Sequence, residues 1–372
     1  MRDSIEDLVW VDFKTMESFM ADVLKALGVP EDGARIAADV LITADRRGID
    51  SHGINRLKPM YCDRIRNGTL DPKAKPEVVR EGPTTVVIDG HHGLGHPIAK
   101  KAMGMAIDKA KKYGMGMAVV RNSNHYGIAG YYSMMAEREG MIGISGTNAR
   151  PSVAPTFGVE NMMGTNPFAF AIPTDEDFPF VFDAATSITQ RGKVEVYARQ
   201  GKKLPEGLLI GEDGEPLTDP DRILEDLKKG KAAFCPLGGI GEETGGHKGY
   251  GYAAVVEILS SALQSGSFLK MVSGMGGDGK PVPCAIGHFF IAIDVSAFTD
   301  IGPFRKTTGD ILRALRASKK VPGKDRIYTA GEKEHLVWLE RKDKGVPLNA
   351  NLQKEVRSLR DDLGLSGYDF PF

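Results

Sequence analysis

The chain has 372 residues, with 48 basic and 49 acidic side chains and a formal net charge of −1 at pH 7. This length suits two domains, perhaps three in the longest arrangement, around a large core, and the mixed charges argue against a nucleic-acid-binding surface. No apolar run reaches the ~18 residues that a membrane span needs. Three widely separated cysteines and an acidic N-terminus without a signal-peptide core favour a reducing compartment. We therefore expect a cytoplasmic protein that binds neither nucleic acid nor membrane.

The first part of the chain, residues 12–68, has the pattern of three helices. Apolar side chains at helical spacing predict one helix over 12–27 and a second over 32–47. A third is expected to begin at Ser51, as its N-cap, and to run as far as residue 68. On that helix His52 and Arg56 form an i, i+4 pair and project from one face.

The pairing of His52 with Arg56 carries the first chemical signal. Histidine has an unperturbed pKa near neutrality, which suits proton transfer, and the planar guanidinium of arginine fits a carboxylate. The pair indicates a site that holds an acid and exchanges a proton beside it. The alternative is a capped surface helix with a solvated arginine.

A change of pattern at Thr84 marks the start of an α/β region, after a connection rich in proline and charge. Runs of apolar residues predict strands, separated by stretches at helical spacing. The expected strands are 84–89, 117–120, 142–145, 168–172, 180–182 and 289–294, and the expected helices are 97–113, 131–139, 193–200 and 252–264. The region after residue 304 is expected to be mainly helical. The alternation of strand and helix is typical of an α/β fold.

Two polar side chains stand where strands end, a position at which sites gather in α/β proteins. His125 lies in a polar turn after strand 117–120, and Asp183 follows strand 180–182. A carboxylate at Asp183 would orient a histidine and stabilise its cationic form. The alternatives are a turn cap for His125 and a helix cap for Asp183.

The glycine-rich stretch 238–251 leads into a helix and contains Lys248. Free N–H groups, flexible glycine and a lysine charge suit a phosphate or another anion, with an unusually flexible loop as the alternative. A G-x-G-x-x-G match at 274–279 is rejected because proline and polar linker follow it, with no helix. The histidines in 91–96 lack an accompanying carboxylate or cysteine at ligand spacing, so we expect no metal site.

Five stretches together resemble the malate/L-lactate dehydrogenase type-2 family, and they occur in the family's order. They are Asp50-Ser51-His52-Gly53-Ile54-Asn55-Arg56, Asn122 to Gly127, Gly164-Thr165-Asn166-Pro167, Asp183-Ala184-Ala185-Thr186-Ser187 and Gly246-His247-Lys248-Gly249-Tyr250-Gly251. A late stretch, Gly331-Glu332-Lys333-Glu334, is similar to the family's Pro-Gly-Glu-x-Glu cofactor segment, although Ala330 replaces the proline. The resemblance spans most of the chain.

This resemblance implies an NAD(P)-dependent oxidoreductase, most similar to malate dehydrogenase, that acts on 2-hydroxy or 2-oxo acids. It implies a non-Rossmann, NAD(P)-binding mixed α/β domain and a helical domain built from both chain ends. Residues 1–80 would be the N-terminal part of the helical domain, 81–300 the cofactor and substrate region, and 301–372 the helical C-terminal part that packs on the N-terminal helices. A homodimer is expected, with NAD or NADP as cofactor.

The resemblance also implies roles for individual residues. His52 would be the acid/base with Asp183 near it, and His125 is the alternative acid/base. The implied substrate-binding residues are Ser51, Arg56, Asn148 and Thr165. The implied cofactor-binding residues are His125, Asp183, Ala184, Ala185, Thr186, Ser187, His247, Lys248, Gly249, Gly331 and Glu332.

Two alternatives stay open at the level of the sequence. One is a related reductase of lactate-type, sulfolactate, ureidoglycolate, diketogulonate, cyclic-imine or keto-sugar substrates. The other is a non-redox protein that binds a phosphorylated ligand through Arg56 and the loop at Lys248. Spacing reveals no second anion-binding residue, so it does not select malate over lactate or sulfolactate.

Overall fold

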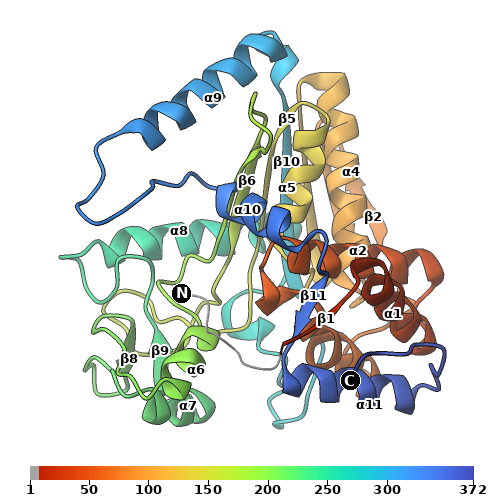
Figure 1. Ribbon diagram of the computed structural model, residues 1–372, viewed down its shortest axis with the longest axis vertical. Coiled ribbons are helices and arrows are strands. Elements are labelled where there is room, and N and C mark those ends of the chain that lie inside the picture. Colours follow the sequence, from red (N-terminus) through yellow and green to blue (C-terminus); the bar gives the residue numbers. More distant parts are fainter. Residues whose placement is uncertain (1–7) are drawn as a thin grey trace.

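A seven-stranded mixed sheet forms the centre of the computed structural model, which describes residues 8–372 (Figure 1). Its strand order is β2-β3-β4-β10-β5-β6-β7, and only β3 and β4 run parallel to each other. The strands are β2 (Glu77–Glu81), β3 (Thr85–Asp89), β4 (Met115–Ser123), β5 (Met141–Thr147), β6 (Phe168–Ile172), β7 (Phe180–Ala184) and β10 (Ile286–Asp294). This arrangement differs from a parallel Rossmann sheet and confirms the predicted mixed α/β class.

Helices cover both faces of this sheet. On one face α4 (Gly95–Tyr113) and α5 (Ala129–Arg138) bury a core that includes Ala102, Tyr132 and Phe290. On the other face α8 (Gly246–Leu259) places Val256 against Phe289. Alternate residues of β10 therefore face opposite helices, as the period of two in a strand requires.

The two ends of the chain share a separate helical core. It is formed by α1 (Phe13–Ala26), α2 (Glu31–Arg46), α11 (Ala350–Asp362) and a small sheet of β1 (Val9–Val11) with β11 (Val346–Leu348). Phe19, Leu41, Val356 and Phe370 are among its buried residues. The packing of both ends against each other confirms the predicted helical part.

Helix α9 (Ile301–Ala317) departs from the expectation that the whole C-terminal part packs on the N-terminal helices. It stands away from α1 and α11 in Figure 1. Its Arg313 instead pairs with Asp175, between β6 and β7, with Nη1 and Oδ1 2.9 Å apart. Because α9 is largely exposed, its charged pattern indicated a helix but not the surface that it contacts.

A third group of elements lies beyond β7. It contains α6 (Arg191–Arg199), β8 (Leu209–Gly211), α7 (Pro220–Lys229) and β9 (Ala232–Phe234), which enclose a small core of their own. Helix α10 (Glu332–Arg341) returns the chain to α2. Among residues 8–372, no helix combines the length and the apolar character that crossing a membrane requires.

Candidate active site

The segment from Asp50 to Arg66 is a series of short turns rather than the predicted single helix. Two 3-10 turns, Asp50–His52 and Ile54–Arg56, precede a π-helical turn (Leu57–Cys62) and α3 (Asp63–Arg66). Gly53, between the first two turns, has φ −89° and ψ −138°, outside the helical region. The expectation that His52 and Arg56 share a helix face was therefore wrong, and Ser51 does not cap a helix.

A buried carboxylate causes this interruption. Asp45 at the end of α2 is 1% exposed, and its Oδ2 accepts a hydrogen bond from the Ile54 N–H at 2.9 Å. A Cβ on Gly53 would lie 1.8 Å from Oδ1 of the same carboxylate, so only glycine fits there. Burial raises the pKa of Asp45 well above its usual value. Asp45 thus fixes the turn that separates His52 from Arg56.

The substitution Gly53→Ala is expected to destabilise the protein by about 1–3 kcal/mol, the usual range for a side chain forced into filled space. It should also lower kcat, because the turn that carries His52 must shift. The matched control is Gly104→Ala in the middle of α4, where a Cβ meets nothing within 4 Å. Denaturant midpoints and kcat of the two variants make the comparison, and equal midpoints would contradict this account of Asp45.

Hydrogen bonds bring His52 and Arg56 together without a common helix. The Arg56 Nε donates to the Ser51 carbonyl oxygen at 2.6 Å, so the guanidinium folds back over the first turn. The Ser51 hydroxyl and Nδ1 of His52 are 2.9 Å apart. Ser51 therefore contacts both predicted functional side chains, one through its backbone and one through its hydroxyl.

His125 lies next to His52 but differs from it in hydrogen bonding. The two rings stack with centroids 5.7 Å apart. Nδ1 of His125 accepts from the Gly127 N–H at 3.3 Å and lies 2.6 Å from the Tyr61 hydroxyl. Because a backbone N–H only donates, Nδ1 is an acceptor, and the neutral ring carries its proton on Nε2. His125 is thereby suited to donate a hydrogen bond, whereas His52 keeps one ring nitrogen for proton transfer.

The environment disfavours charge on both histidines. Burial, assisted by the nearby Arg56 charge, lowers the pKa of His52 to about 4. Burial and the neighbouring His52 and Arg56 also lower the pKa of His125 well below its usual value. Both rings are consequently neutral near pH 7 in the free protein.

Two cavities meet beside His52. The larger cavity has a volume of about 510 Å³, and the smaller cavity has about 290 Å³. Ile49, Ile128, Asp183 and Glu334 line both, so the two cavities form one continuous cleft. The predicted residues on the wall of the larger cavity are Ser51, His52, Thr165, Asp183, Ala184, Ala185 and Ser187. Gly331 lies on the wall of the smaller one.

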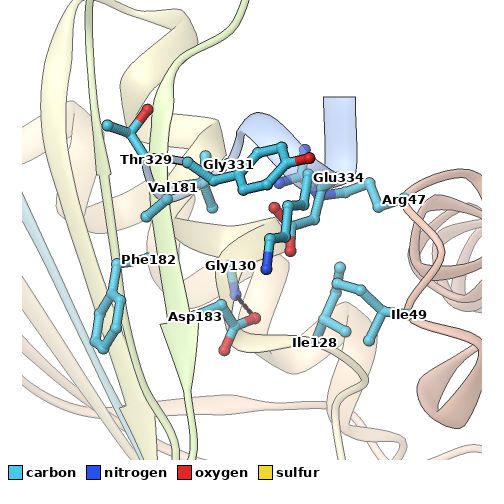
Figure 2. A pocket seen from close by; sticks show the side chains of 13 residues that line it. Arg47, Ile49, Ile128, Gly130, Val181, Phe182, Asp183, Thr329, Gly331 and Glu334 are labelled. Carbon is cyan, nitrogen blue, oxygen red and sulfur yellow. Dashed lines mark hydrogen bonds between the residues drawn. The ribbon is translucent and has the colours of Figure 1, made fainter. Parts of the chain in front are cut away.

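Asp183 stands at the junction of the cavities, where Figure 2 shows its carboxylate hydrogen-bonded to Gly130. Its Oδ2 accepts from the Gly130 N–H at 2.7 Å. Burial raises the pKa of Asp183 to about 6. We expected this carboxylate to orient a histidine, but in the described chain the hydrogen bonds that fix the ring orientations come from Ser51, Tyr61 and Gly127.

Asn148 and Thr186, predicted to touch ligands, are turned into the protein instead. The Asn148 amide donates to Glu257 Oε1 at 3.2 Å and accepts from the Gly287 N–H. The Thr186 hydroxyl donates to the carbonyl oxygens of Thr165 and Asn166. Both side chains therefore hold the strand ends that form the cavity wall, and the side chains on that wall are their neighbours.

The start of α8 supports the cavity from behind. Gly249 packs so tightly that a Cβ there would lie 2.1 Å from the Leu237 carbonyl oxygen, and Leu237 lines the larger cavity. His247 and Lys248 are exposed and lie outside the residues that line either cavity. Glu332 is 1% exposed, and its Oε2 accepts from the Thr329 N–H at 3.0 Å. It shapes the turn at Gly331 rather than facing the cleft.

Several side chains of the cleft carried no signal in the sequence. Arg47, Tyr328 and Lys333 line the smaller cavity, Lys193 lines the larger one, and Glu334 lines both. Lys193 appeared only as part of a basic helix, and Arg47 only as the end of α2. Their spacing along the chain is unrelated to His52, so only the folded arrangement reveals them.

Comparison with known proteins identifies relatives over nearly the whole chain. The family model "Malate/L-lactate dehydrogenase" matches residues 11–357. A malate dehydrogenase of Pyrococcus horikoshii is 43% identical, covering 97% of this chain and 98% of the relative. An L-sulfolactate dehydrogenase of Methanocaldococcus jannaschii is 38% identical, covering 95% and 97%. The crystal structure of malate dehydrogenase from Entamoeba histolytica has a TM-score of 0.93 at 48% identity, covering 98% of this chain and all of that one.

Proposed function

We propose that this chain, which belongs to the malate/L-lactate dehydrogenase family, interconverts malate and oxaloacetate in the cleft beside His52. Family membership and full-length similarity make it an NAD(P)-dependent dehydrogenase of hydroxy acids. Malate as the substrate, the choice of cofactor and the roles of individual residues are the proposal.

The residues of the cleft fit a nicotinamide cofactor. The small side chains of Ala184 and Ala185 and the backbone at Gly127 leave room for a ligand against the sheet edge. Apolar Ile49 and Ile128 stand beside the cations Arg47 and Lys333, a combination suited to a ring next to sugar and phosphate. When bound, the cofactor supplies hydride transfer, which is its own chemistry.

His52 moves the proton that accompanies this chemistry. Its Nδ1–H donates to the Ser51 hydroxyl, so Nε2 is the nitrogen that takes the proton from the hydroxyl of malate or returns it to the oxygen of oxaloacetate. A substrate carboxylate beside Arg56 opposes the guanidinium charge that depresses the pKa of His52. Binding of the acid therefore raises the pKa of His52 toward the range in which it can carry a proton.

Arg56 holds the carboxylate next to the reacting carbon. Its Nε is occupied by the Ser51 carbonyl, and its two Nη groups remain for the substrate. Nε2–H of His125 donates a hydrogen bond to the substrate, and Thr165 contributes its side chain to the same wall. These contacts fix the orientation in which C2 of the acid is exposed to reaction.

One observation carries the proposal: His52, held by Ser51 and adjacent to Arg56, lies on the wall of a cavity long enough to continue past Asp183. The test is a panel of oxaloacetate, pyruvate, sulfopyruvate and a cyclic 2-imino acid with NADH and with NADPH. We expect the nicotinamide absorbance band to decrease, with the highest kcat/KM for oxaloacetate. The same panel decides between NAD and NADP.

The rivals predict different outcomes of that panel. A sulfolactate or cyclic-imine enzyme would show its highest kcat/KM with the corresponding substrate. A non-redox protein that binds a phosphorylated ligand would leave the nicotinamide band unchanged with every acid, and this result would refute the proposed reaction.

We further propose a cytoplasmic homodimer, with the helical, cofactor and C-terminal parts divided at residues 80 and 300. Support for association comes from α8, on which the apolar side chains of Tyr252, Val255 and Ile258 are more than half exposed. Support for a reducing compartment comes from the cysteines of the described chain, Cys62, Cys235 and Cys284, which are free and buried.

A further inference from the structure

Lys193 shares the larger cavity with His52. It belongs to the first turn of α6, which follows the strand-end segment 183–189. Among the described residues that line this cavity, Lys193 is the one lysine or arginine side chain. The acids Asp183 and Glu334 belong to the junction with the smaller cavity, and Lys193 does not line that cavity. The larger cavity therefore has a cationic part away from the junction.

The charge of Lys193 is not neutralised within residues 8–372. Its neighbour Arg191 pairs with Glu195, with Nε and Oε1 3.0 Å apart, whereas no carboxylate of the described chain lies within 4 Å of the Lys193 ammonium. The N-terminus of α6 adds to the positive potential, because its cap residue Gln190 makes no side-chain capping bond and also lines the cavity. Both features favour an anion at this place.

We propose that Lys193 binds the second anionic group of the substrate, the distal carboxylate of malate and oxaloacetate, while Arg56 holds the carboxylate beside the reacting carbon. This inference rests on the proposed function and adds the residue that selects the substrate class. An ammonium is a point charge on a flexible stem, so it accepts a carboxylate or a sulfonate without a fixed geometry. Lactate, which has a methyl group in that place, would leave Lys193 unpaired.

The alternative ligand for Lys193 is a phosphate of the cofactor. The two cases separate by which binding constant changes. A lysine on a substrate carboxylate affects substrates with a second anion and leaves cofactor affinity unchanged, whereas a lysine on a phosphate affects the cofactor with every substrate.

The experiment compares Lys193→Gln with Lys202→Gln, a matched change at an exposed lysine just after α6 that lies outside the cavity. Steady-state rates are measured with oxaloacetate and with 2-oxobutyrate, which lacks the distal charge. If 2-oxobutyrate turns over too slowly, its competitive inhibition constant against oxaloacetate replaces KM. The dissociation constant of the reduced cofactor is measured by nicotinamide fluorescence.

For Lys193→Gln we expect kcat/KM for oxaloacetate to fall roughly 10–100-fold, mainly through KM, the size of a lost charge-assisted contact. The constants for 2-oxobutyrate and for the cofactor should stay within about twofold of the parent, the margin left by an exposed side chain, as should all constants of Lys202→Gln. Equal losses with both acids, or a weakened cofactor, would overturn the assignment. Absence of turnover in the unmodified protein would instead refute the proposed function itself.

Discussion

Replacing His52 by alanine is expected to lower kcat by roughly 10²–10⁴, the usual range for losing a general acid/base. The ring lies on the cavity wall with Nδ1 engaged by Ser51, and Nε2 is the nitrogen available to the substrate oxygen. Cofactor affinity should persist, because the other residues that line the cleft are unchanged. Stopped-flow and steady-state rates, together with a fluorescence titration of the reduced cofactor, measure the two quantities separately.

The matched comparison is His125→Ala in the neighbouring ring. Because Nδ1 of His125 receives the Gly127 N–H, the neutral ring offers a hydrogen bond but no free basic nitrogen. We expect this variant mainly to raise KM. If it abolishes turnover while His52→Ala only weakens substrate binding, the two roles are exchanged and the hydrogen bonding around the rings has been misinterpreted.

The change Arg56→Lys is expected to raise KM for the oxo acid and to lower kcat, with a combined loss in kcat/KM of roughly 10–100-fold. The guanidinium uses Nε for the Ser51 carbonyl and keeps its fork for the substrate, and one ammonium cannot do both. The loss should therefore appear in substrate binding and in the position of Ser51, which holds His52.

The control for Arg56→Lys is Arg66→Lys, ten residues further along. Arg66 forms a surface pair with Asp362, with Nη2 and Oδ2 3.9 Å apart. Exposed pairs of this kind contribute little, so kcat and KM should match those of the parent. Full activity of Arg56→Lys would show that the substrate carboxylate is held by another residue.

Local sequence pattern was sufficient to find the strands but not their order. The six predicted strands all belong to the central sheet, because their runs of apolar and β-branched residues are buried on both faces. The position of β10 between β4 and β5 depends on pairing between residues far apart in the chain, such as Ile291 with Met117. Strand β2 was missed because its residues are charged and mostly exposed.

The candidate site was only partly predictable for a similar reason. Motif residues of the sequence led to His52, Thr165 and Asp183, which do line the cleft. Helical spacing misled the interpretation of His52 and Arg56, since the carboxylate of Asp45 interrupts the helix from nine residues upstream of Ile54. Asn148 lies in the same part of the chain as a cavity wall, but Glu257 of α8 holds its amide inward.

The most direct test of the central claim follows one hydrogen atom. Oxaloacetate is incubated with this protein and a reduced nicotinamide cofactor that carries deuterium on the transferable face of C4, and the product is analysed by mass spectrometry and NMR. We predict malate with one deuterium at C2 in the parent, and a rate of its formation that falls with His52→Ala. Malate without deuterium at C2, or no consumption of the cofactor, would contradict the account.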